Sequence, residues 1–241
     1  MTTLIKILVT FLLSLLLVSC NFDMNFGGVR GNGNVQLEDR TLNASFTAIE
    51  ASQGLDVYLT QSNDESIVIE ADENLHEIIK TEVKGNVLRI YSDKNIGYAK
   101  SKKIMVNFKT LSKISSSSGS DVAITNTITT DHLELNTSSG SDMTLKVNTT
   151  EFECHSSSGS DLKLSGSTQK LVAEASSGSD INAGDLIAES SRVKASSGAD
   201  ITVNTVKELT ADANSGGDIK YYGNPEKINK NNGPSGSIRK Q

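Results

Sequence analysis

The sequence predicts an all-β protein: a single-stranded, right-handed parallel β-helix preceded by an N-terminal β-rich capping or insertion region. Three observations predict this fold class. One pentapeptide returns at near-constant spacing along the C-terminal half, apolar residues alternate around it with a period of two, and amphipathic helical patterns are nearly absent. Gly, Ser, Thr, Asn and Asp are plentiful and Trp is absent, which suits short strands and tight turns.

The repeated pentapeptide is Ser-Ser-Gly-Ser-Asp with its drifted forms, from Ser117–Asp121 to Asn214–Asp218. A fixed motif between stretches of slightly varying length is typical of a solenoid, in which each copy marks the same corner of successive rungs. The glycines of the six corners are 21, 19, 19, 20 and 18 residues apart, at Gly119, Gly140, Gly159, Gly178, Gly198 and Gly216.

Alternation through each copy indicates two strands with one buried face that meet at the corner. In the second copy, alternate residues from Leu133 to Val147 share one parity. We therefore expect glycine to turn the chain, the second and fourth motif residues to pack inward, and Asp to point outward. A right-handed coil is favoured because left-handed coils usually follow strict hexapeptides. A flat β-sandwich is the alternative, but it does not require one pentapeptide at near-constant spacing.

The region before the regular repeat contains one degenerate copy of the same pattern. Residues 49–59 align with residues 114–124, and Gly54 and Asp56 keep the motif's Gly-x-Asp. We therefore expect a first degenerate rung and a hairpin insertion within residues 31–110. The regular β-helix is then expected over residues 111–222, with a cap or tail over residues 223–241.

Local signals inside the insertion predict its smaller elements. Asn63-Asp64 and Gly85-Asn86 are turn signals between alternating runs, which predicts two hairpins. Residues 72–80 are expected to form one short helix with Asp72 as its N-cap.

The N-terminus has the pattern of a bacterial lipoprotein. Lys6 precedes an apolar run, and Leu17-Val18-Ser19-Cys20 resembles a lipobox with cleavage before the cysteine. The apolar run is well short of the roughly 20 residues that span a bilayer. Residues 1–19 are therefore predicted to be a signal peptide, Cys20 to be lipidated, and residues 20–30 to form a tether. This predicts a lipid-anchored protein of the bacterial cell envelope, expected at the outer membrane, on its periplasmic or surface face.

Charge and cysteine content narrow the function classes. Without residues 1–19 the chain keeps 22 of its 23 basic residues against 29 acidic ones, a net charge of −7. That balance argues against nucleic acid as a partner. Cys154 is the one cysteine after Cys20, so an intramolecular disulfide is excluded if Cys20 is lipidated, and we expect Cys154 to be a small buried core residue.

The acids of the corners form the feature richest in chemical alternatives. If the rungs stack in register, their carboxylates line one edge. Hydrogen bonds within each corner, as in Asx turns, explain the row structurally. A row of cations, calcium above all, is the alternative, but each rung supplies one acid. No metal or cofactor is therefore predicted, and calcium stays the open alternative for Asp121, Asp142, Asp161, Asp180, Asp200 and Asp218.

An enzymatic function is the second functional class that the sequence allows. Adjacent rungs place two carboxylates about 5 Å apart, near the separation found in retaining glycosidases, so a polysaccharide lyase or hydrolase is an alternative function. A catalytic pair needs two carboxyls with different pKa values, whereas the motif is uniform. His76, His132 and His155 are scattered without a Ser-His-Asp or metal-ligand spacing. We predict no catalytic residues. The expected function is an adhesin or binding scaffold for glycans or other surface proteins, or a purely structural envelope protein.

The order of these features resembles the family described as putative auto-transporter adhesin, head GIN domain. The resemblance covers almost all of residues 30–240 and implies a β-helical fold, secretion to the envelope and an adhesin role, without catalytic residues to carry over. Besides the serial corners it is carried by Gly31-Asn32-Gly33-Asn34, Phe46-Thr47-Ala48-Ile49-Glu50, Gly54-Leu55-Asp56-Val57-Tyr58-Leu59, Asp72-Glu73-Asn74-Leu75 and Tyr222-Gly223-Asn224-Pro225.

Overall fold

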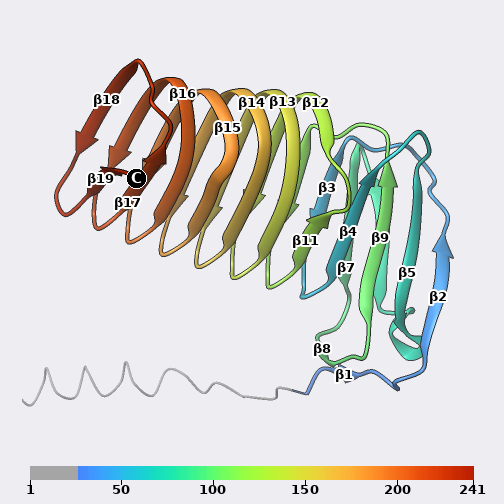
Figure 1. Cartoon of the computed structure of the whole chain (residues 1–241). Coiled ribbons are helices and arrows are strands. Elements are labelled where there is room, and N and C mark those ends of the chain that lie inside the picture. The colour runs from blue at the N-terminus through green and yellow to red at the C-terminus, as the bar shows by residue number, and fades with distance from the viewer. Residues whose placement is uncertain (1–26) are drawn as a thin grey trace, which may run out of the picture.

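The computed structural model describes residues 27–241 and confirms the predicted fold class (Figure 1). It is an all-β parallel solenoid of about seven turns with rungs of about 19 residues. The predicted signal peptide, Cys20 and most of the tether lie outside the described residues. Among residues 27–241, no helix has the length and apolar character needed to cross a bilayer.

Strands account for nearly all regular structure of the described chain, with one short 3-10 helix, η1 (Glu73–Leu75). The strands in chain order are β1 (Val29–Arg30), β2 (Val35–Arg40), β3 (Ala48–Ala51), β4 (Asp56–Gln61), β5 (Ser66–Asp72), β6 (Ile79–Lys84), β7 (Val87–Ser92), β8 (Ile96–Tyr98), β9 (Lys102–Phe108), β10 (Lys113–Ser116), β11 (Asp121–Ile124), β12 (Ile128–Thr137), β13 (Asp142–Ser157), β14 (Asp161–Ser176), β15 (Asp180–Ala195), β16 (Asp200–Ala213), β17 (Asp218–Tyr222), β18 (Lys227–Asn232) and β19 (Ser237–Lys240).

The coil has two long sides, and strand pairing continues along each side from end to end. On one side β2, β5, β9, β4 and β11 lead to the first halves of β13–β16 and then to β17 and β19. On the other side β6, β7, β3, β10 and β12 lead to the second halves of β13–β16 and then to β18. The N-terminal β region therefore lengthens both sides of the solenoid around one shared core.

The regular rungs bury alternate side chains along single long strands. In β13 the residues Leu145, Val147, Phe152 and Cys154 are at most 1 % exposed, while their neighbours face outward. Cys154 is thus the buried core residue expected from its position, and burial raises the pKa of its thiol. Because the rungs stack in register, each corner residue lies beside its counterpart in the next rung.

The degenerate copy of the repeat is confirmed as the first rung. Strands β3 and β4 pair in parallel with β10 and β11, which places Ile49 beside Ile114 and Asp56 beside Asp121. Asp56 therefore begins the row of corner acids, one rung earlier than the regular repeat.

The insertion differs from expectation in two places. The Gly85-Asn86 hairpin forms between β6 and β7, but Asn63-Asp64 does not close a hairpin, because β9 lies between β4 and β5. The helix expected over residues 72–80 is reduced to η1, and the chain enters β6 at Ile79. The prediction that Asp72 caps a helix was wrong, because its side chain makes no capping hydrogen bond.

Asp72 instead ties together two of the motifs that carry the family resemblance. Its fully buried carboxylate accepts backbone N–H bonds from Gly33 at 2.9 Å and from Lys100 and Ser101 at 3.1 Å. A Cβ at Gly31 would lie 2.0 Å from Asp72 Oδ2, so this position requires glycine. Burial acts to raise the pKa of Asp72, but the three N–H donors outweigh it and the pKa is lowered.

The segment expected as a cap or tail forms β18 and β19, which continue the solenoid as its last rung. Tyr221 is buried at this end. The Lys230 ammonium lies 4.6 Å from the centre of the Tyr221 ring, so a cation–π contact covers the end of the core.

Candidate functional site

Each corner is a tight turn in which two consecutive residues have positive φ. In the first regular copy, φ is 55° at Ser118 and 72° at Gly119, and Ser120 N–H donates to Ser117 O at 3.3 Å. Two central residues with positive φ define a type I′ turn. Glycine adopts this conformation freely, whereas the preceding serine does so at a cost in backbone strain.

This turn corrects the predicted orientation of the second motif serine. Ser118 and Ser139 are exposed and do not pack inward, because the left-handed pair interrupts the alternation of the strands. The inward hydroxyls belong to the fourth motif residue and to the residue just before the motif. In the third copy these are Ser160 and Ser156, with their Oγ atoms 2.9 Å apart.

The buried hydroxyl pair is complete in the first three regular rungs, keeps one hydroxyl in the fourth and is absent from the last two. The successive pairs along the stack are Ser116/Ser120, Thr137/Ser141, Ser156/Ser160, Ala175/Ser179, Ala195/Ala199 and Ala213/Gly217. Where serine remains, its hydroxyl is satisfied: Ser160 Oγ donates to Ser157 O at 2.8 Å. The pair is therefore an internal structural feature and is not accessible to a ligand.

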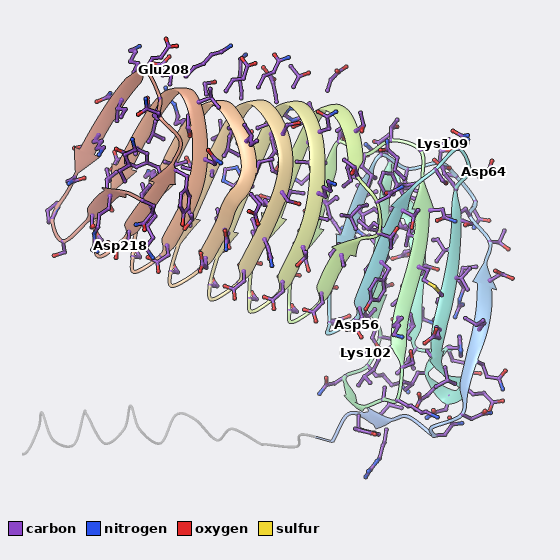
Figure 2. The ribbon with its side chains drawn as sticks, viewed as in Figure 1. Asp56, Asp64, Lys102, Lys109, Glu208 and Asp218 are labelled. Atoms are coloured by element: carbon purple, nitrogen blue, oxygen red, sulfur yellow. The ribbon has the colours of Figure 1, made fainter. Side chains whose placement is uncertain are left out.

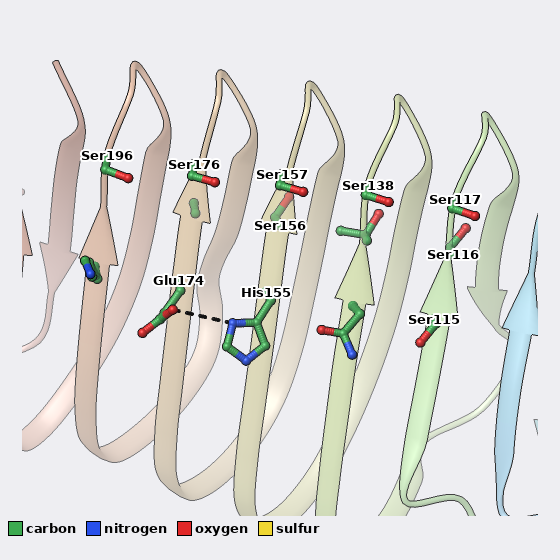
Figure 3. A pocket seen from close by; sticks show the side chains of 14 residues that line it. Ser115, Ser116, Ser117, Ser138, His155, Ser156, Ser157, Glu174, Ser176 and Ser196 are labelled. Atoms are coloured by element: carbon green, nitrogen blue, oxygen red, sulfur yellow. Dashed lines mark ion pairs between the residues drawn. The ribbon is translucent and has the colours of Figure 1, made fainter. Parts of the chain in front are cut away.

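The outward serines of the same corners form an accessible row. Ser117, Ser138, Ser157, Ser176 and Ser196 are in corresponding positions, and Figure 3 shows their hydroxyls in one line with similar directions. None of these five Oγ atoms makes a side-chain hydrogen bond within residues 27–241. They line a groove of about 440 Å³ that crosses five rungs. These hydroxyls are free to bond to a ligand.

A second column beside the serines gives the groove its chemical variety. Ser115, Asn136, His155, Glu174 and Lys194 occupy successive rungs in register. His155 Nε2 lies 2.9 Å from Glu153. Its Nδ1 lies 3.7 Å from Glu174, the ion pair drawn in Figure 3. The groove is therefore neutral at one end and carries acidic and basic groups at the other.

A second hollow, of about 630 Å³, lies at the opposite bend and is lined mostly by Thr, Asn and Ser. Its hydroxyls are more engaged with the protein than those of the serine groove. Thr149 Oγ1 donates to Thr168 Oγ1 at 3.0 Å, and Ser167 Oγ donates to Asn148 Oδ1 at 3.1 Å. The serine groove is thus the better candidate for recognition.

The predicted row of outward corner acids is present along one edge of the solenoid, from Asp56 to Asp218 (Figure 2). Partial burial and the neighbouring carboxylates raise the pKa of Asp121 and of Asp180. Each end of the row has a basic neighbour. Lys102 Nζ lies 3.7 Å from Asp56, and Arg239 lies 3.9 Å from Asp218.

Asp121 and Asp180 lie three rungs apart in this row and are not adjacent carboxylates. The pKa values of Asp121 and Asp180 are raised by the same causes, desolvation first and adjacent carboxylates second. In the described part of the chain, no three His, Cys, Asp or Glu side chains are grouped so as to hold a metal ion.

The three histidines occupy separate places. His132 and His155 face outward on neighbouring rungs. His76 is only 7 % exposed, and its Nδ1 lies 3.0 Å from Glu38 of β2. Sequence reasoning missed this burial, because the turn after η1 folds His76 beneath a strand that is 36 residues earlier in the chain.

Comparison with known proteins agrees with this geometry. Residues 45–225 match the family described as putative auto-transporter adhesin, head GIN domain. A solved structure of a putative adhesin from Bacteroides fragilis is 26 % identical, with a TM-score of 0.83 over 89 % of this chain and 100 % of that one. Curated protein sequences gave no match.

Two more distant structures share the fold. A putative lipid binding protein from Parabacteroides distasonis is 22 % identical, with a TM-score of 0.72 over 88 % of this chain and 99 % of that one. A putative adhesin from Parabacteroides merdae is 18 % identical, with a TM-score of 0.72 over 88 % and 98 %.

Proposed function

The chain belongs to the head GIN domain family, and on that premise we propose that it is a non-catalytic, lipid-anchored envelope protein that binds an extended glycan along the serine groove. The observation that carries the proposal is the row of five outward hydroxyls that make no side-chain hydrogen bond to any residue the structure describes. The related structure from Bacteroides fragilis, described as a putative adhesin, supports a binding role.

The spacing of the groove suits a repeating polymer. Parallel strands lie about 4.8 Å apart, so the hydroxyls recur at about that interval along the solenoid axis. An extended saccharide chain with a similar repeat is able to meet one serine per unit. Many weak contacts of this kind add up through effective concentration. His155, Glu174 and Lys194 supply the charged contacts that select among glycans.

The proposed anchor places one end of the solenoid near the membrane. The described chain begins at Gly27, seven residues after Cys20. Seven extended residues reach at most about 25 Å, so acyl chains on Cys20 hold the β1–β8 end within that distance of the bilayer. The solenoid then presents its grooves from a membrane-tethered base.

A glycan array tests the binding proposal. The wild-type protein is compared with Ser157→Arg, which fills the groove, and with Thr144→Arg, which adds the same charge on the other side of the same rung. We expect binding that Ser157→Arg reduces at least tenfold and Thr144→Arg leaves unchanged. Silence of the wild type on glycans and in pull-downs from envelope extracts contradicts the adhesin proposal and leaves a structural role.

Membrane fractionation tests the anchor separately. Cys20→Ala is expected to release a folded protein from the membrane fraction, because the acyl chains are lost. Retention of that variant in the membrane contradicts lipidation at this residue.

A further inference from the structure

The C-terminal end of the solenoid has a charge opposite to that of the rest of the protein. Residues 219–241 contain five basic residues and one acidic residue, a net charge of +4, whereas the whole chain carries −6. The basic residues are Lys220, Lys227, Lys230, Arg239 and Lys240. Four of them lie on β18 and β19, the last strand on each side of the coil.

Both terminal strands have a free edge. Within the described chain β18 pairs only with β16 and β19 only with β17. All six residues of β18 are exposed, and Ile228 at core parity is 43 % exposed. A free edge of this kind is able to accept a further strand through its backbone N–H and C=O groups.

The pairing already made by β18 indicates the chemistry of such a strand. Its neighbour β16 places Glu208 against Lys227, with the ion pair at 2.7 Å, and Asp212 against Asn231, with a hydrogen bond at 3.0 Å. The same strand places Leu209 beside Ile228. A second strand of this pattern on the free edge meets the same basic and apolar groups.

From the free edge and the complementary charge we propose that the C-terminal end of the solenoid captures an extended acidic segment of a partner protein as an added strand beside β18. The segment alternates acidic residues on its outward side with apolar residues on its inward side. The apolar residues cover Ile228, and the acidic ones face Lys227 and Asn231. This surface is separate from the serine groove and does not depend on the glycan proposal.

The competing account is that the lysines only prevent strand addition. Charged residues at inward positions of an edge strand oppose edge-to-edge association, and Lys230 and Lys240 occupy such positions. Lys227 instead lies on the outward side of β18, where it already pairs with the acid Glu208, so the two accounts differ in what an acidic peptide does.

The test uses the full-length protein in detergent and a fluorescent peptide, ELTADA, with the sequence of Glu208–Ala213. We expect saturable binding that weakens at least tenfold in Lys227→Glu. Lys163→Glu, an equal charge change on an interior rung, is the matched control and is expected to bind as the wild type does. The charge-reversed peptide KLTAKA is expected to bind Lys227→Glu better than it binds the wild type.

Backbone N-methylation of alternate peptide residues separates strand addition from simple charge attraction. The N-methylated peptide is expected to lose binding at least tenfold, because it is unable to donate to the strand edge. Equal binding of both peptides overturns the proposal in favour of a general polyanion surface. Absence of binding to the wild type overturns it in favour of edge protection alone.

Discussion

The backbone N–H of Gly159 donates a hydrogen bond to the carbonyl of Ser177 at 3.2 Å, and both residues have left-handed backbone conformations. The same bond recurs at successive corners, from Gly54 N–H to Ser118 O through Gly198 N–H to Ser215 O. The corner is therefore a hydrogen-bonded stack. The serine contributes its backbone carbonyl to this bond, and its side chain takes no part in it.

Ser158→Gly is expected to raise the free energy of unfolding by about 0.5 kcal/mol, because it relieves a positive φ of 58° that disfavours L-residues by about 1 kcal/mol or more. Ser157→Gly is the matched control, since its hydroxyl is equally free of protein partners and its φ is not positive. It is expected to lower stability by about 0.5 kcal/mol. Urea denaturation measures both. Equal signs for the two variants contradict the strain argument.

Gly166→Ala is expected to destabilise far more than Gly159→Ala, although both glycines have positive φ. A Cβ at Gly166 would lie 1.9 Å from Val147 O, whereas a Cβ at Gly159 meets nothing within 4 Å. We expect a loss of about 1 kcal/mol for Gly159→Ala and about 3 kcal/mol or more for Gly166→Ala. Thermal unfolding of the two variants decides, and similar losses speak against the tight rung contact at Gly166.

Removal of one hydroxyl of the buried pair is expected to lower the free energy of unfolding by more than half of the loss that removal of both hydroxyls causes. Ser156→Ala leaves the Ser160 hydroxyl with one fewer partner in a buried place, a loss of about 1 to 2 kcal/mol. The double variant creates the Ala/Ala arrangement that rung five already has at Ala195 and Ala199. A double-mutant cycle in urea is the measurement, and strict additivity contradicts coupling of the pair.

Asp180→Asn is expected to stabilise the protein at neutral pH. The pKa of Asp180 is raised in the folded state, so its contribution is most favourable below its unfolded pKa and is lost as pH rises through the folded pKa. Asn does not ionise, so the variant avoids this loss of stability at neutral pH. The gain should shrink as pH falls toward about 3.9, the ordinary Asp value. Unfolding measured from pH 3 to pH 7 tests this, and a gain that grows on acidification is the contrary result.

Asp72→Asn provides the control of opposite sign. The pKa of Asp72 is lowered, so its stabilisation is present above its unfolded pKa and is lost as pH falls through its folded pKa. The variant is expected to be less stable than the wild type at pH 7 and closer to it in acid. Parallel pH profiles for Asp72→Asn and Asp180→Asn contradict the assignment of opposite pKa shifts.

The solenoid was predictable from sequence because its determinants are local and repeated. The glycine spacing predicts the rung length, and the apolar parity predicts the buried side, including Cys154. The same alternation of apolar residues predicts the degenerate rung at residues 49–59, and strand pairing places it beside residues 114–124. The acid row follows from a fixed motif stacked in register.

The features that were missed depend on geometry that periodicity does not encode. Strict alternation of buried and exposed residues correctly predicts that Thr137 and Ser141 are buried. It wrongly predicts that Ser139 is buried too, because a type I′ turn lies between the two strands. The insertion of β9 between β4 and β5 is a long-range pairing without a local pattern. The outward hydroxyl groove has no separate sequence signal, because each corner contains both inward, bonded serines and outward serines without side-chain hydrogen bonds among the described residues.

Identical corners create a threading problem during folding, since a rung that skips its neighbour still meets another Ser-Ser-Gly-Ser-Asp corner. The side-chain ion pairs differ from rung to rung. Lys113 meets Glu134 at 2.9 Å, and further pairs between neighbouring rungs include Glu151–Lys170, Glu189–Lys207 and Glu208–Lys227. Each such pair contributes at most about 1 kcal/mol to stability. Their larger effect is expected on misaligned coils, in which a skipped rung leaves these charged residues without their partners. Because salt screens this difference, refolding yield should fall at high salt even where the native state is unaffected.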